Sequence, residues 1–175
     1  LNKIKRLTAQ NLHRSWLNVP HVTHSDESNI DDLESFRKQL NKESANQENG
    51  IKLSPLAFVV KAVVNGLQKF PQFNSSLDSS GDNLIYKKYF NIGIAVETPN
   101  GLVVPVLKGV DSMSISDIAD EMNTLATKAR DKKLSPADMS GACFTISSLG
   151  GIGGTSFTPI VNAPEVAILG VSRSK

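Results

Sequence analysis

The sequence has little of several features, and each scarcity excludes a class of protein. Its one cysteine, Cys143, excludes an intramolecular disulfide and any zinc site with several cysteine ligands, and is typical of a reducing compartment. No run approaches the roughly 18 consecutive apolar residues of a membrane-spanning helix. Neither charge sign dominates, because 17 Asp and Glu are interspersed among 19 Lys and Arg. We therefore expect neither a membrane nor nucleic acid as a partner.

The two ends of the sequence lack the usual signs of a natural start and stop. Leu1 is not an initiator methionine, and the first fifteen residues hold no signal-peptide core. The polar residues 172–175 follow directly on an apolar run. We expect both ends to be internal to a longer protein. The 175 residues, 39% hydrophobic and 21% charged, are enough for one globular domain rather than two.

Apolar side chains recur at helical spacing in several segments, and each pattern predicts an α-helix. These segments are residues 3–16, 31–40, 56–70 and 115–129. The third is apolar on nearly every face, so we expect it to be buried on most sides. The polar stretch 41–49 is expected to fray or loop, and Gly50 to end the second helix.

Short polar side chains mark the starts of three of these helices. Asn29 or Asp31 is a candidate cap for the second helix. Ser54, followed by a proline, is a candidate cap for the third. Ser114 with Asp117 three residues later has the spacing of a capping box for the fourth.

Six further segments are expected to be strands, and a Pro-Asn-Gly turn at 99–101 predicts a hairpin between two of them. They are residues 21–24, 84–86, 91–97, 102–107, 143–146 and 166–171. Helices and strands alternate irregularly, which predicts an α/β fold with a mixed sheet flanked by helices.

The glycine-rich stretch 149–154 does not have the spacing of a nucleotide-binding loop. Counted from Gly151, the sixth position of a G-x-G-x-x-G motif is Ser156, and the stretch contains no lysine for a P-loop. Two serines, Ser147 and Ser148, precede it at the end of an expected strand. Their hydroxyls could bind a ligand or a developing oxyanion, or could simply bond to backbone and close the loop. The residues alone favour the second interpretation.

The histidines do not form a metal site, and we expect no bound metal. His21 and His24 are three residues apart on an expected strand and would point to opposite faces. His13 lies among polar positions of the first helix and is expected to be solvated. Cys143, flanked by Ala142 and Phe144, is expected to be a small core residue.

Six segments, in order along the chain, carry a resemblance to a known family. They are VPHVT (19–23), FNSSL (73–77), NIGIAV (91–96), GLVVPV (101–106), FTISSLG (144–150) and PEVAILG (164–170). Together they resemble the catalytic core of the 2-oxo acid dehydrogenase acyltransferases over essentially the whole chain. The Ser-Ser-Leu-Gly form favours the acetyl branch, with the branched-chain branch as the closer alternative.

The resemblance implies a fold and an activity. The fold is chloramphenicol acetyltransferase-like, with residues 1–175 as one catalytic core that lacks the final strand and helix. The activity is transfer of an acetyl group between dihydrolipoamide and coenzyme A in a pyruvate dehydrogenase complex. The implied partners are two further copies in a homotrimer that assembles into a larger core, lipoyl domains carrying the lipoyl group, the pyruvate decarboxylating component and dihydrolipoamide dehydrogenase. The implied location is the cytoplasm of a bacterium or a mitochondrial matrix.

The resemblance also implies roles for particular residues. Ser147 would stabilise the tetrahedral oxyanion. Contacts with coenzyme A are implied for Arg37, Ser54, Glu97, Ser147 and Ser148. Phe157 and Leu169 match residues that line or gate the thiol channel, although ordinary core packing is an equally good interpretation of both.

The histidine motif of the family, H-x-x-x-D-G, is absent from these residues. None of the three histidines is followed by Asp-Gly at the right interval. Since this histidine would be the general base, we expect residues 1–175 alone to be nearly inactive. Two alternatives stay open: a noncatalytic trimeric scaffold, and, less well supported by PEVAILG, an antibiotic acetyltransferase.

Overall fold

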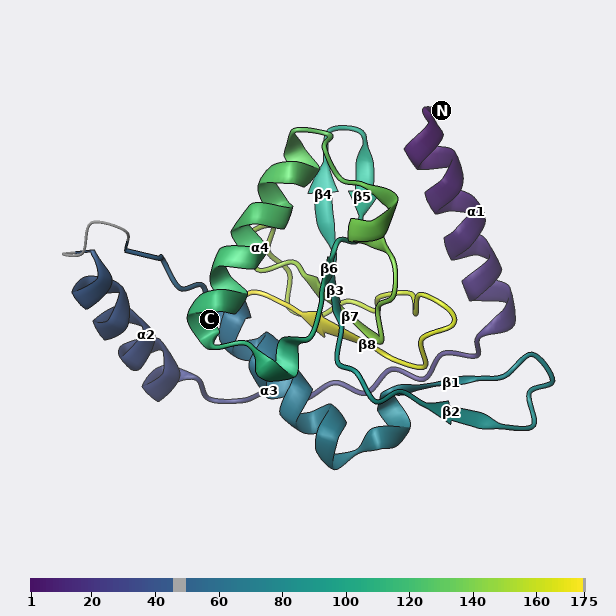
Figure 1. Ribbon diagram of the computed structural model, residues 1–175, viewed down its shortest axis with the longest axis horizontal. Coiled ribbons are helices and arrows are strands. Elements are labelled where there is room, and N and C mark those ends of the chain that lie inside the picture. Colours follow the sequence, from purple (N-terminus) through teal and green to yellow (C-terminus); the bar gives the residue numbers. More distant parts are fainter. Residues whose placement is uncertain (46–49, 175) are drawn as a thin grey trace.

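A computed structural model describes residues 1–45 and 50–174 of the chain. Four α-helices lie in this part: α1 (Lys3–Asn18), α2 (Asp31–Ser44), α3 (Pro55–Lys69) and α4 (Ile115–Arg130). Figure 1 shows α3 and α4 close to the central strands, with α1 and α2 at opposite sides of the molecule. No helix in these two described ranges is long and apolar enough to cross a membrane.

The central sheet of the described residues has four strands in the order β6-β3-β7-β8. These strands are β3 (Ile92–Ile94), β6 (Val106–Leu107), β7 (Phe144–Ser148) and β8 (Ile168–Val171). Strand β3 is antiparallel to β6 and parallel to β7, and β7 is parallel to β8. The sheet is therefore mixed, as the sequence predicted.

Two antiparallel hairpins accompany the central sheet. The first joins β1 (Ser75–Leu77) to β2 (Leu84–Tyr86) and projects from the body of the molecule (Figure 1). The second joins β4 (Val96–Thr98) to β5 (Gly101–Val103) through the expected turn, where Gly101 has a φ of 129°. In Figure 1, α4 and α1 lie on either side of this second hairpin.

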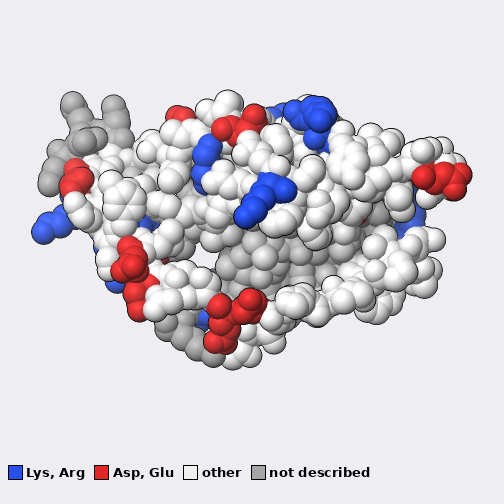
Figure 2. Space-filling view, turned by 90° about the horizontal axis from the view of Figure 1, so that it is seen from below, with Lys and Arg blue, Asp and Glu red and all other residues white. Residues whose placement is uncertain are grey.

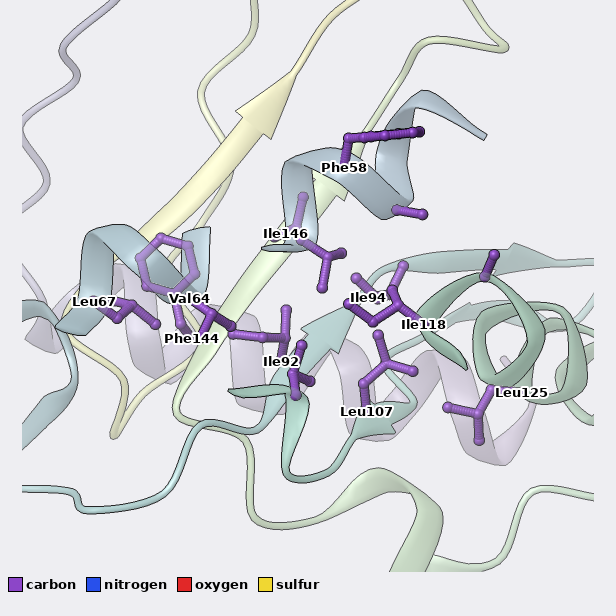
Figure 3. Packing of buried hydrophobic residues seen from close by; sticks show 14 of the residues in the cluster. Phe58, Val64, Leu67, Ile92, Ile94, Leu107, Ile118, Leu125, Phe144 and Ile146 are labelled. Atoms are coloured by element: carbon purple, nitrogen blue, oxygen red, sulfur yellow. The ribbon is translucent and has the colours of Figure 1, made fainter. Parts of the chain in front are cut away.

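The hydrophobic core lies between one face of the sheet and the helices α3 and α4. Ile92, Ile94 and Ile146 point from β3 and β7 toward Val64 of α3 and Ile118 of α4 (Figure 3), and all five are at most 7% exposed. Since side chains alternate along a strand, Gly93, Thr145 and Ser147 must lie on the opposite face. The core thus settles which face each functional side chain of the sheet occupies.

The expected capping hydrogen bond is confirmed at α4 and is wrong at α3. Ser114 Oγ accepts from the Asp117 amide at 3.1 Å while Asp117 accepts from the Ser114 amide at 2.9 Å, so the capping box of α4 is present. The Ser54 side chain makes no capping hydrogen bond, although a proline does follow it as the first residue of α3. The Ser54 hydroxyl is therefore not occupied by the helix.

The second helix also differs from its sequence prediction. Neither candidate caps α2: the residue at its cap position is Ile30, which provides no side-chain hydrogen bond. Asn29 Oδ1 instead accepts from the Asp31 amide at 2.8 Å, just before the helix. The helix extends through Ser44, into the stretch 41–49 that was expected to fray or loop, and so ends before Gly50, the expected end. The rest of the predicted loop, residues 46–49, lies outside the described residues.

The predicted strand at 21–24 is wrong. These residues lie in an irregular segment, 19–30, that links α1 to α2 and pairs with no described strand. Its β-branched residues do not find a neighbouring strand, and side-chain contacts with residues 158–161 hold it instead. The chain also bends within two other predicted strands, so that residues 91–97 and 102–107 each form two short strands.

Candidate active site

Strand β7 ends in two serines whose side chains lie on opposite faces of the sheet. Phe144 and Ile146 of the same strand point into the core beneath α3 and α4. By alternation, Ser148 lies on this helix-covered face and Ser147 lies on the other. The two hydroxyls are therefore directed into different environments, although they are adjacent in the sequence.

Ser147 lies beside an aromatic ring. It pairs with Gly170 of β8 in the parallel register, and paired residues of parallel strands share a face. The ring of Phe157 covers Gly170 so closely that a Cβ added there would be 3.0 Å from Phe157 Cζ. The Ser147 hydroxyl is half-buried and makes no hydrogen bond to any residue of the two described ranges. It is a donor held by a strand and free to bind a ligand.

Ser148 lines a cavity of about 340 Å³ on the helix-covered face. The Glu97 carboxylate lines the same cavity, is exposed, and has no hydrogen-bond or ion-pair partner within the described residues. The rest of the wall is mostly apolar and comes from α3, β3, β4 and α4. These wall residues include Leu56, Ala95, Met122 and Ala126. With Asn123, three polar side chains stand in an otherwise apolar pocket, which suits a long, partly apolar ligand.

Arg37 belongs to α2, and its guanidinium reaches the residues just before α3, where it is already partly engaged. Its Nε and Nη2 donate to the two carboxylate oxygens of Glu34 at 2.8 Å each, and Nη1 donates to the Leu53 carbonyl at 3.0 Å. The paired hydrogen bonds between Arg37 and Glu34 lower the pKa of the Glu34 carboxyl and raise that of Arg37. Arg37 therefore adjoins Ser54 through Leu53, and two of its five N–H groups have no protein acceptor in the described part of the chain.

The two residues expected to border the thiol channel lie on different faces of the sheet. Leu169 pairs with Ile146 and packs against the hydrophobic core. Phe157 lies on the side of Ser147. The structure therefore brings Phe157 together with Ser147, and it places Leu169 among the core residues.

A buried polar cluster behind Ser147 was not predicted from the sequence. Glu165 is 4% exposed, and its Oε1 accepts from the side-chain amide Nδ2 of Asn162 at 3.3 Å. Burial raises the pKa of Glu165, while Thr145, Asn162 and the charge of Lys87 oppose the rise. Thr145 Oγ1 and Glu165 Oε2 are both buried without a hydrogen bond of good geometry to another described residue.

The histidines and the cysteine do not supply a base beside Ser147. His13 and His24 are exposed, and both ring nitrogens of His21 are hydrogen-bonded to backbone. Cys143 is fully buried, and burial raises the pKa of its thiol, as expected for a core residue. None of these four side chains in the described residues is placed beside Ser147 as an unbonded base.

A mixed sheet with helices on its core face and a free serine hydroxyl at a strand end is typical of a chloramphenicol acetyltransferase-like acyltransferase. Comparison with known families gives the particular group: the chain belongs to the 2-oxoacid dehydrogenases acyltransferase family (catalytic domain), whose family model matches residues 1–175. The family and the fold that the sequence motifs predicted are both confirmed.

Individual relatives are similar over nearly the whole chain. The dihydrolipoyllysine-residue acetyltransferase component of the pyruvate dehydrogenase complex of Cupriavidus necator is 60% identical over 174 residues, which are 99% of this chain and 31% of that protein. Among solved structures, the dihydrolipoamide acetyltransferase of Azotobacter vinelandii has a TM-score of 0.97 at 54% identity, with 100% of this chain and 71% of that chain covered. The same values hold for the cubic core of a pyruvate dehydrogenase multienzyme complex. The chain thus spans about a third of the length of the first relative.

Proposed function

We propose that the protein to which this chain belongs transfers an acetyl group between dihydrolipoamide and coenzyme A within a pyruvate dehydrogenase complex. The observation that carries the proposal is the Ser147 hydroxyl, which the end of β7 presents free of protein partners on one face of the sheet. The similarity to named acetyltransferase components supports the acetyl branch.

Ser147 acts on the charge that develops during transfer. The sulfur of coenzyme A attacks the acetyl carbonyl carbon, its proton passes to a base, and the carbonyl oxygen becomes an oxyanion. The Ser147 hydroxyl donates a hydrogen bond to this oxygen. The C–S bond to the lipoyl group then breaks, and the leaving sulfur takes up the proton. One such donor is worth on the order of 10²–10³ in turnover.

The remaining site residues bind the coenzyme. The cavity lined by Ser148 and Glu97 takes the pantetheine arm, whose amides need a few polar groups in an apolar wall. Arg37 and Ser54 lie together near its Leu56 wall, where two free guanidinium N–H groups and an unbonded hydroxyl suit phosphate. Phe157 lies at the thiol end beside Ser147.

The base is the histidine of an H-x-x-x-D-G motif outside residues 1–175. Lipoyl groups arrive on lipoyl domains, the chain forms trimers that assemble into a larger core, and the partner enzymes are a pyruvate decarboxylating component and dihydrolipoamide dehydrogenase. The cubic core among the solved relatives supports the larger assembly. The proposed location is the bacterial cytoplasm, or the mitochondrial matrix of a eukaryote.

The test is an acyl-transfer assay with the full-length protein. Acetyl-, isobutyryl- and succinyl-coenzyme A are each offered with dihydrolipoamide, and chloramphenicol is offered as a competing acceptor of the acetyl group. We expect the highest kcat/KM with acetyl-coenzyme A and dihydrolipoamide. Preference for isobutyryl transfer, or acetylation of chloramphenicol alone, would refute the proposal.

A further inference from the structure

The imidazole of His21 bridges two backbone groups that are far apart in the sequence. Its Nδ1 lies 2.6 Å from the Val19 carbonyl oxygen, and its Nε2 accepts from the Val161 amide at 2.8 Å. Because a carbonyl only accepts and an amide N–H only donates, Nδ1 carries the proton and Nε2 carries a lone pair. The geometry thus requires the neutral imidazole with one particular tautomer.

Two further hydrogen bonds join residues 15–23 to segment 157–163. The Thr23 hydroxyl donates to the Thr158 hydroxyl at 3.3 Å, and the buried Ser15 hydroxyl accepts from the Ala163 amide at 3.4 Å. Both are longer than the His21 bond. Of these three hydrogen bonds between segment 157–163 and residues 15–23, the one to His21 is the shortest.

The held segment leads directly to Ser147. Phe157, its first residue, packs its ring on Gly170, and Gly170 pairs with Ser147. Val161 is only four residues from Phe157, and Pro159 between them restricts the backbone. A shift of segment 157–163 would therefore move the ring beside the Ser147 hydroxyl.

We propose that His21 is a positioning residue: its imidazole holds segment 157–163, and with it the Phe157 ring, in place beside Ser147. This role rests on the proposed function, because it assumes that thiol substrates bind beside Ser147. The hydrogen bond between His21 and Val161 is a feature of the fold and does not depend on that assumption.

Trp16 of α1 lies beside the imidazole, with 5.6 Å between the ring centroids. The hydrogen bond to Val161 therefore links segment 157–163 to a ring that α1 also contacts.

The experiment compares full-length wild type with His21→Ala, His21→Gln and the matched control His24→Gln, whose histidine is exposed and has no described contact. Hydrogen exchange of the peptide covering 157–163 is measured at pH 7.5, with the peptides of α3 and α4 as a folding control. Steady-state kinetics give KM for dihydrolipoamide and kcat at the same pH.

In His21→Ala we expect the protection of the 157–163 backbone amides against hydrogen exchange to fall about tenfold at pH 7.5. The protection of α3 and α4 should not change, and His24→Gln should behave like wild type. His21→Gln keeps part of this protection, because its side-chain amide oxygen can still accept from the Val161 amide. KM rises severalfold in His21→Ala while kcat changes less than twofold.

Two results would overturn the proposal. Equal protection in wild type and His21→Ala would show that His21 does not hold the segment. Lost protection with unchanged KM would exclude a positioning role. If the protein transfers no acetyl group, the exchange data still decide whether the hold exists, so this failure is distinct from failure of the proposed function.

Discussion

The ring of Phe157 occupies the space in front of Gly170, where an added Cβ would lie 3.0 Å from Cζ and 3.3 Å from Cε1 and Cε2. Gly170 pairs with Ser147, so the absence of a side chain on β8 lets an aromatic ring approach the serine. The wall beside the proposed oxyanion position therefore depends on a glycine in β8.

Gly170→Ala tests this wall. The methyl group pushes the half-buried ring away from the sheet, so we expect KM for dihydrolipoamide to rise severalfold, with a loss of less than about 3 kcal/mol in the free energy of unfolding. Steady-state kinetics and urea denaturation measure the two effects. The double variant with Phe157→Leu should regain part of the lost stability. A Gly170→Ala protein with unchanged KM would contradict the claim that the Phe157 ring borders the substrate beside Ser147.

Arg37→Ala tests the coenzyme contact. With two of its N–H groups free of described partners, Arg37 is expected to bind phosphate, so its loss should raise KM for coenzyme A about tenfold. Pantetheine, which has no phosphate, is the control acceptor, and its KM should not change. A similar increase with both acceptors would instead assign Arg37 to fold stability through Glu34 and Leu53.

Glu165 is expected to make stability fall as pH rises. Burial raises its pKa in the folded state above the ordinary value near 4.5, so unfolding releases a proton in the interval between the two pKa values. The stabilisation is complete below the ordinary pKa and is lost as pH passes through the raised one. Urea denaturation from pH 4 to 8 should show this slope in wild type and a smaller slope in Glu165→Gln. Equal slopes would be inconsistent with a buried, titrating Glu165.

Residues 1–175 alone are expected to transfer acetyl groups at least about 10²-fold more slowly than the full-length protein, because the general base lies outside them. Both proteins are assayed under the same conditions, and circular dichroism checks that the shorter one is folded. Equal rates would show that no histidine beyond these residues is needed.

The elements with strong local signals were predicted from the sequence. The fourth helix carries its capping box at Ser114 and Asp117, and its apolar stripe meets the sheet as periodicity requires. The third helix is buried as expected, but its Ser54 hydroxyl is unbonded, because a favourable residue type does not ensure a capping geometry. Local patterns thus located these helices without fixing each side-chain contact.

The errors concern contacts between distant parts of the chain. Residues 21–24 have the residue types of a strand, yet His21 bonds to Val161, which is 140 residues away. Periodicity cannot reveal such a partner. For Leu169 the sequence left core packing and a place at the thiol channel equally open. Its position among core residues follows from the register of β8 against β7, and its channel role stays a prediction. The alternation that separates Ser147 from Ser148 could have been read from the sequence once the core face was known.

The most direct test of the account is the turnover number of Ser147→Ala in the full-length protein, beside Ser148→Ala as the matched control on the opposite face. We expect kcat to fall about 10²–10³-fold in Ser147→Ala with little change in KM, because the lost hydrogen bond acts on the transition state. Ser148→Ala should mainly raise KM for coenzyme A. A Ser147→Ala enzyme with wild-type kcat would contradict the role of Ser147 in stabilising the oxyanion.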